Sequence, residues 1–168
     1  MTVKSFKTSG IGVDLARPGI LQVKSTIKTN TFSLSSATFT DVTGLNVSIT
    51  PSSASNKVLV MLDMRMNGTS AVANAFYRIL QGSTVIYQGD TAGSRSRGVG
   101  NALGGNEAML SCTAIFLDSP ATTSSVTYKV QIYSNTAAAI YVNRGALDTD
   151  NAGQLRGASS ITVMEVTP

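Results

Sequence analysis

The sequence predicts an all-β protein, an antiparallel jelly-roll-like β-sandwich with an extended N-terminal arm. Three observations lead to this fold class. Strand-like segments separated by short turns follow one another along most of the 168 residues. Charged residues make up only 13% of the chain, about half of the roughly 25% usual in soluble domains. No segment shows a convincing 3.6-residue apolar period of the kind that indicates a helix. The length suits one domain, which we place at residues 20–168, after an arm of residues 1–19.

The first predicted strands follow from residue type and from alternation. Residues 20–28 are rich in β-branched and apolar types, and residues 31–42 carry large apolar side chains among Ser and Thr. Residues 45–49 alternate apolar with polar, as a half-buried strand does, and Pro51 follows them. Residues 58–66 are apolar on both faces at first and then carry charges on one face. This pattern predicts a central strand whose end reaches solvent.

The remaining predicted strands are 75–80, 84–88, 107–117, 126–133, 138–142 and 160–166. A turn at residues 81–83 joins the first two of them into a hairpin. Many short strands at regular spacing, without a repeat of about 20–50 residues, favour a sandwich over a solenoid or propeller. A jelly roll is the simplest sandwich of this kind.

Two longer segments, residues 89–106 and 143–158, interrupt the strand pattern. Loops of this length in a compact domain are usually functional or mobile. We expect both at one end of the sandwich, where their charges would form a polar contact surface. The candidate contact residues are Arg95, Arg97, Asn101, Arg144, Asp148, Asp150 and Arg156.

The net charge of +4 is concentrated near the N-terminus. Residues 29–168 hold equal numbers of basic and acidic side chains, so residues 1–28 carry the whole excess. A basic segment on a neutral body predicts attachment to an acidic protein surface. A solubilising tail is the first alternative. Nucleic-acid binding is disfavoured because the body has no basic stripe with interleaved aromatic residues. Apolar residues of the arm can add a strand to the open sheet edge of a partner. The candidate docking residues are Lys4, Lys7, Ile11, Val13, Leu15 and Arg17.

The sequence offers few parts for chemistry. It has no His, which excludes Ser-His-Asp and Cys-His catalytic arrangements and imidazole zinc sites. Cys112 lies in an apolar segment, so we expect a buried thiol that packs as a small hydrophobe. The run from Asp148 resembles the start of a calcium loop, but Ser159 stands where a bidentate Glu is needed. We therefore predict no catalytic residue, no metal site and no cofactor. A polysaccharide-degrading or carbohydrate-binding module is the alternative class, with Asp148 and Asp150 as its candidate carboxylates.

The sequence also contains no membrane-spanning or export signal that we recognise. No apolar run approaches about 18 residues, and the N-terminus has no apolar core of a signal peptide. The single cysteine cannot form an internal disulfide. We expect a protein made in a reducing compartment and without a membrane partner.

Five stretches carry a resemblance to a known family: residues 20–33, 39–62, 77–90, 116–134 and 161–166. They resemble a β-rich virion protein family of tailed phages, common among phages of marine and freshwater bacteria. Its members are tail-fibre segments or short stand-alone virion proteins. The resemblance covers most of residues 20–166 and implies a homotrimer or other oligomer at the virion surface. It also implies assembly in the host cytoplasm with other virion proteins, either the major capsid protein or a tail component.

Two functions are compatible with that resemblance. One is a capsid decoration protein, of the cement or head-fibre type, that docks on the shell through its N-terminal arm. The other is a tail-fibre or receptor-binding tip that recognises host surface glycans. The sequence lacks the long helical or repetitive shaft expected of a full fibre, which favours decoration.

Overall fold

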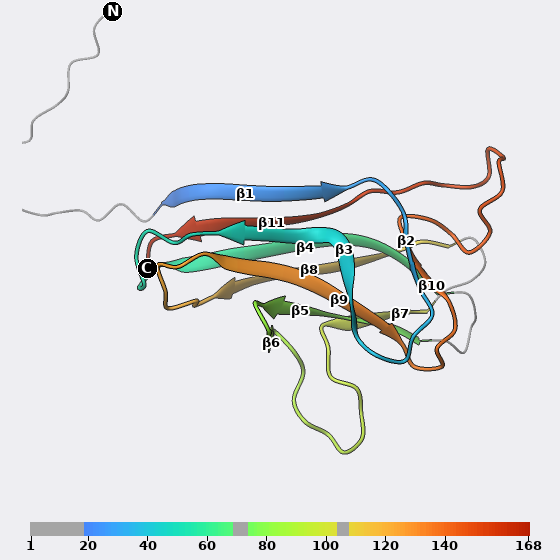
Figure 1. Ribbon diagram of the computed structural model, residues 1–168, viewed down its shortest axis with the longest axis horizontal. Helices are drawn as coiled ribbons and strands as arrows, with labels where there is room; N and C mark the ends of the chain where they lie inside the picture. Colours follow the sequence, from blue (N-terminus) through green and yellow to red (C-terminus); the bar gives the residue numbers. More distant parts are fainter. Residues whose placement is uncertain (1–18, 69–73, 104–107) are drawn as a thin grey trace, which may run out of the picture.

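The computed structural model describes residues 19–68, 74–103 and 108–168 as an antiparallel β-sandwich (Figure 1). These residues form eleven strands and no helix, which confirms the predicted fold class. Accordingly, they contain no helical segment with the length and hydropathy needed to cross a bilayer. The predicted docking residues of the arm lie outside the described residues.

The first sheet has the order β1-β11-β4-β8, and all of its pairs are antiparallel. Two short strands, β10 and β2, continue it beyond the end of β11, with β10 paired to the last residues of β4. Its strands are β1 (Ile20–Lys28), β2 (Phe32–Leu34), β4 (Lys57–Gly68), β8 (Leu110–Asp118), β10 (Ile140–Val142) and β11 (Ser159–Val166).

The second sheet has the order β3-β9-β5, with β6 and β7 paired in succession along the free edge of β5. Its strands are β3 (Thr40–Ile49), β5 (Asn74–Gln81), β6 (Thr84–Ile86), β7 (Gly100–Leu103) and β9 (Val126–Ser134). Most connections from β3 onward cross from one sheet to the other. This order, in which the first and last long strands pair with each other, is the double Greek key of a jelly roll.

The core lies between the two sheets and is built by strict alternation. On β4, every second side chain from Val58 to Met66 is buried, and on β9 the same holds from Val126 to Ile132. Each fully buried side chain of this size contributes about 1.5–3 kcal/mol relative to an exposed one. β4 is paired on both sides, so the prediction of a central strand at residues 58–66 is confirmed.

Two predicted boundaries are wrong. Residues 31–42 and 45–49 were expected as separate strands, but the break comes after Leu34 and β3 then runs without interruption through Gly44. Gly44 has a φ of 81°, and the register with β9 shifts there. Five residue steps from Asp41 to Asn46 lie opposite two steps from Gln131 to Lys129, so the bulge holds three extra residues and breaks the alternation on which the prediction relied. The predicted loop 89–106 also contains β7.

A buried carboxylate closes one end of the sandwich. Glu165 of β11 is fully buried on the core side. It accepts hydrogen bonds of 2.6 Å from Gln22 Nε2, Asn56 Nδ2 and the Ser52 backbone N–H, and one of 2.7 Å from Ser52 Oγ. Burial raises the pKa of Glu165, but these hydrogen bonds outweigh burial and lower the pKa to about 2. The carboxylate thus ties β1, β11 and the turn after β3 together, and no cationic side chain among the described residues pairs with it.

Candidate interaction surfaces

The loop between β10 and β11 starts from a rigid anchor, Asn143. This residue is buried and has a left-handed φ of 65°, which Asn tolerates better than most residues. Its backbone N–H donates to Arg65 O at 3.0 Å, and its Nδ2 donates to Lys28 O at 2.8 Å. Its Oδ1 accepts a 2.6 Å hydrogen bond from Ser159 Oγ. Because both strands that flank the loop are held by one side chain, the loop leaves the sandwich at a fixed place.

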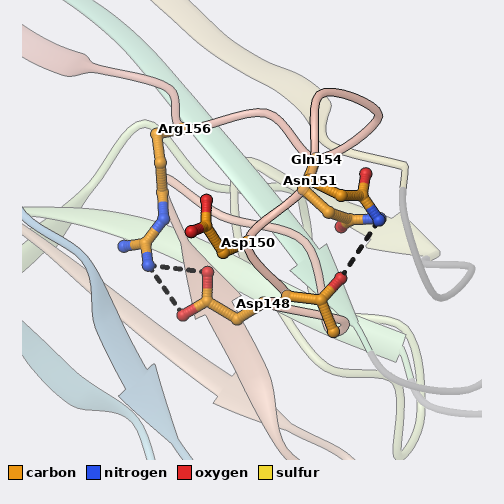
Figure 2. A pocket seen from close by; sticks show the side chains of 6 residues that line it. Asp148, Asp150, Asn151, Gln154 and Arg156 are labelled. Atoms are coloured by element: carbon orange, nitrogen blue, oxygen red, sulfur yellow. Dashed lines mark hydrogen bonds and ion pairs between the residues drawn. The ribbon is translucent and has the colours of Figure 1, made fainter.

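This loop encloses an open polar depression of about 320 Å³. Figure 2 shows the Asp148 carboxylate pointing at the Arg156 guanidinium, which lies 2.7 and 2.8 Å from its two oxygens. Arg144, stacked on the ring of Tyr141, lies 3.8 Å from the same carboxylate. The lining residues are Asp148, Thr149, Asp150, Asn151, Gln154 and Arg156.

The depression is suited to hydrogen bonding rather than to metal binding. Two guanidinium groups already neutralise Asp148, so a cation at the same oxygens would be repelled. Within residues 19–68, 74–103 and 108–168, no group of three or more His, Cys, Asp or Glu side chains is arranged to hold a metal ion. Asp150 has no hydrogen-bond partner among the described residues. Its exposed carboxylate and the amides of Asn151 and Gln154 therefore offer acceptors and donors to a polar ligand.

The second long loop runs from Tyr87 to β7 and lies elsewhere. Figure 1 shows it hanging from the β6 and β7 side of the second sheet, whereas the β10–β11 loop extends past the far end of β1. The ring of Tyr87 stacks on Phe116, with centroids 4.3 Å apart. Arg97 donates to Gly89 O at 2.8 Å, and Arg95 donates to Ala92 O at 3.3 Å. The two loops therefore do not form one contact surface, contrary to the expectation from sequence.

The predicted contact residues divide accordingly. The structure brings together Arg144, Asp148 and Arg156, and it places Asp150 beside them. Asn101 lies in strand β7, where its Nδ2 donates to Asn74 Oδ1 at 3.2 Å. Its assignment to a loop is therefore wrong.

Lys28 was counted with the basic N-terminal segment, but it is buried. Its Nζ donates to Asn30 Oδ1 at 2.8 Å, and burial lowers its pKa. Its charge is therefore not available to a partner.

The sequence reasoning missed a surface on the outward side of the first sheet, the side that faces away from the core. The outward side chains of β1 and β8 are largely apolar, and five of them are exposed to between 51% and 68%. These five residues are Leu21, Val23, Ile27, Ile115 and Leu117. Scattered exposed apolar side chains are common in proteins. Whether these five indicate a contact surface therefore depends on how they are arranged on the sheet.

Three of the five lie in two adjacent rows across the sheet, one apolar throughout and one in which Ser25 and Thr162 hydrogen-bond to each other at 2.8 Å. The backbone register places Val23, Met164, Leu59 and Leu117 side by side on β1, β11, β4 and β8. The next outward row is Ser25, Thr162, Met61 and Ile115. We call the outward surface of β1, β11, β4 and β8 formed by these two rows, with Leu21 and Ile27, the apolar face.

Charged residues bound the apolar face along β4. At one end, Lys57 donates to Ser119 Oγ at 2.7 Å. At the other, Arg65 pairs with Asp63 at 2.6 Å and donates to Ser111 Oγ. The face thus has an apolar centre and a polar rim, which is the usual anatomy of a protein interface.

The outward side of the second sheet is different. There Lys129 pairs with Asp41 at 2.8 Å, and the hydrogen bond from Lys129 is the main cause that lowers the pKa of Asp41. Gln131 links Asp41 to Arg78, and the Arg78 guanidinium stacks 3.9 Å from the Phe39 ring centroid. These polar groups satisfy one another, as expected of a surface that faces water.

No protein-family model matches the chain, and no curated protein matches it by sequence. Among solved structures, PRD1 vertex protein P5 aligns with a TM-score of 0.48 and 14% identity, over 89% of this chain and 99% of that chain. The structure of infectious bursal disease virus Gt strain aligns with a TM-score of 0.45 and 10% identity, over 97% of this chain and 43% of that chain. Neither similarity places the chain in a family or gives it a function.

Proposed function

We propose that the protein is a non-enzymatic virion structural protein, an oligomeric capsid decoration protein of a tailed phage. The observation that carries the proposal is the apolar face, because exposed apolar patches of this kind mark sites of protein assembly. The sequence resemblance to phage virion proteins supports the virion as the place of assembly. Jelly rolls occur in capsid proteins and in lectins alike, so the fold by itself leaves both functions open.

In this proposal the basic segment at residues 1–19 attaches the protein to an acidic groove of the shell. Single exposed ion pairs contribute only about 0–1 kcal/mol each. Attachment must therefore draw on several contacts at once, and an oligomer that presents several arms gains further through avidity.

The test is binding of the purified protein to shells stripped of it, with and without residues 1–19. We expect the full-length protein to bind stoichiometrically over the whole shell and the truncated protein to stay in solution. A control variant, Lys129→Ala, removes a positive charge from the outward side of the second sheet, outside every candidate contact residue, and should bind as the wild type does. Failure of the full-length protein to bind any shell would reject the decoration function.

The second candidate is a tail-fibre or receptor-binding tip that recognises host surface glycans. The polar depression at Asp148 favours it, since carboxylates and amides in a surface hollow can hydrogen-bond to sugar hydroxyls. If the protein adsorbs to host cells, adsorbs less as Asp150→Ala, and does not bind stripped shells, this function replaces the decoration function. Turnover of a host polysaccharide that Asp148→Asn or Asp150→Asn abolishes would instead make the protein an enzyme.

A further inference from the structure

We propose that a second copy of this chain covers the apolar face, so that the outward surface of β1, β11, β4 and β8 is the contact between subunits of the oligomer. This inference deepens the proposed function and rests on it for the place of the oligomer in the virion. The contact itself is argued from the geometry of the sheet.

The size of the apolar face suits a subunit contact. Neighbouring strands lie about 4.8 Å apart and each residue adds about 3.4 Å, so four strands over about seven residues present roughly 450 Å² of flat surface. The accessible area is larger because side chains rise from that plane. Two such surfaces in contact bury roughly 900 Å² in total before this relief is counted, which lies near the lower end of specific protein interfaces.

The composition of the apolar face favours a copy of the chain over a charged partner. Its two central rows contain no ionisable side chain, and the rim carries both signs, with Lys57 at one end and the Asp63–Arg65 pair at the other. Such a rim selects neither an acidic nor a basic partner. A second copy offers apolar rows to cover these rows, and it offers both signs of charge to complement Lys57 and Asp63.

The contrast between the two sheets supports coverage of one side only. On the outward side of the second sheet, the polar side chains are paired with one another in hydrogen bonds and an ion pair. The first sheet instead leaves Ile115 and Leu117 exposed next to Met61 and Leu59. Burying such side chains is favourable by about 25 cal/mol for each Å² of apolar area, which gives association its driving force.

The experiment is the mass of the full-length protein in solution, measured by sedimentation velocity across a wide range of concentrations. We expect the wild type to sediment as a multiple of the 17.4 kDa chain. Ile115→Lys places an ammonium group in the centre of the contact, and we expect it to raise the dissociation constant by more than about tenfold. The matched control Thr43→Lys adds the same charge to an exposed position of β3, in the other sheet, and should leave the mass unchanged.

If Ile115→Lys fails to fold, the double variant Ile115→Thr, Leu117→Thr replaces it, because threonine has the β-branched shape that strands favour. A wild type that is monomeric at every concentration overturns the inference. So does an oligomer that persists in the folded face variants. A monomer that still binds shells leaves the proposed function standing without this contact. An oligomer that depends on the apolar face but binds no shell would support this contact and reject the decoration function.

Discussion

Replacing Glu165 by glutamine tests whether the buried carboxylate holds one end of the sandwich together. Glutamine has nearly the same shape, so packing is preserved. Its carbonyl can still accept from Ser52 and Asn56, but its NH2 group then faces the donor Nε2 of Gln22. Hydrogen bonds to a charged acceptor contribute about 1.5–3 kcal/mol each and neutral ones about 0.5–1.5 kcal/mol. We therefore expect Glu165→Gln to lower the free energy of unfolding by about 3 kcal/mol at neutral pH.

The pKa of Glu165 gives an independent magnitude. The pKa falls from 4.5 to about 2 on folding, and one pKa unit corresponds to about 1.4 kcal/mol. The ionised carboxylate thus contributes about 3 kcal/mol above the pKa of the unfolded state. Because the folded pKa is the lower one, this contribution is lost as the pH falls from about 4.5 towards about 2. Near pH 3 it should have shrunk by about 2 kcal/mol.

Urea unfolding followed by far-ultraviolet circular dichroism, near pH 7 and near pH 3, measures both quantities. The difference between wild type and Glu165→Gln should narrow by about 2 kcal/mol at the lower pH, while other carboxylates titrate equally in both proteins. Asp90→Asn, at an exposed position of the long loop, is the control and should change stability by less than about 0.5 kcal/mol. Equal free energies of unfolding for wild type and Glu165→Gln at neutral pH would refute the role of this carboxylate. So would a difference between them that does not change with pH.

Three further predictions concern the core and the β10–β11 loop. Burial raises the pKa of Cys112 to about 12, so a disulfide reagent should leave the native thiol unmodified and react only after unfolding; rapid native labelling would contradict its burial. Asn143→Ala removes the anchor of the loop and places alanine in a left-handed conformation. It should lower the free energy of unfolding in urea by about 2–4 kcal/mol, whereas the control Asn151→Ala should have a small effect. Asp148→Asn breaks an exposed ion pair, so it should lower global stability by less than about 1 kcal/mol while speeding proteolysis within residues 143–158. Unchanged cleavage there would show that the pair does not order the loop.

The fold class was predictable because alternation survives in most strands. β9 and β11 show it in almost every residue, and the central position of β4 followed from its apolar residues on both sides. The bulge at Gly44 was not predictable by the same reasoning, since an odd number of extra residues, here three, moves the following side chains to the other face. The length of β3 was missed for that reason.

The candidate surfaces were predictable in part. The sequence indicated that residues 143–158 carry charges of both signs, and the structure pairs Asp148 with Arg156. Alternation also placed Glu165 on the same side of its strand as Ile161 and Val163, and this was a signal of a buried carboxylate. The apolar face was missed because its residues come from four strands, and only the register between strands brings them into rows.

The pairing of β1 with β11 has a consequence for how the chain acquires its structure. Gln22 lies opposite Glu165, and the backbone N–H of Thr167 donates to Gly19 O at 3.2 Å, so contacts join the two ends of the described chain. Proteins dominated by such distant pairings fold slowly, in milliseconds to seconds. β11 lies between β1 and β4, yet it is synthesised after both of them. During synthesis the nascent chain therefore holds the two flanking strands apart with unpaired edges, and a chain that stops before residue 159 would keep them open to aggregation.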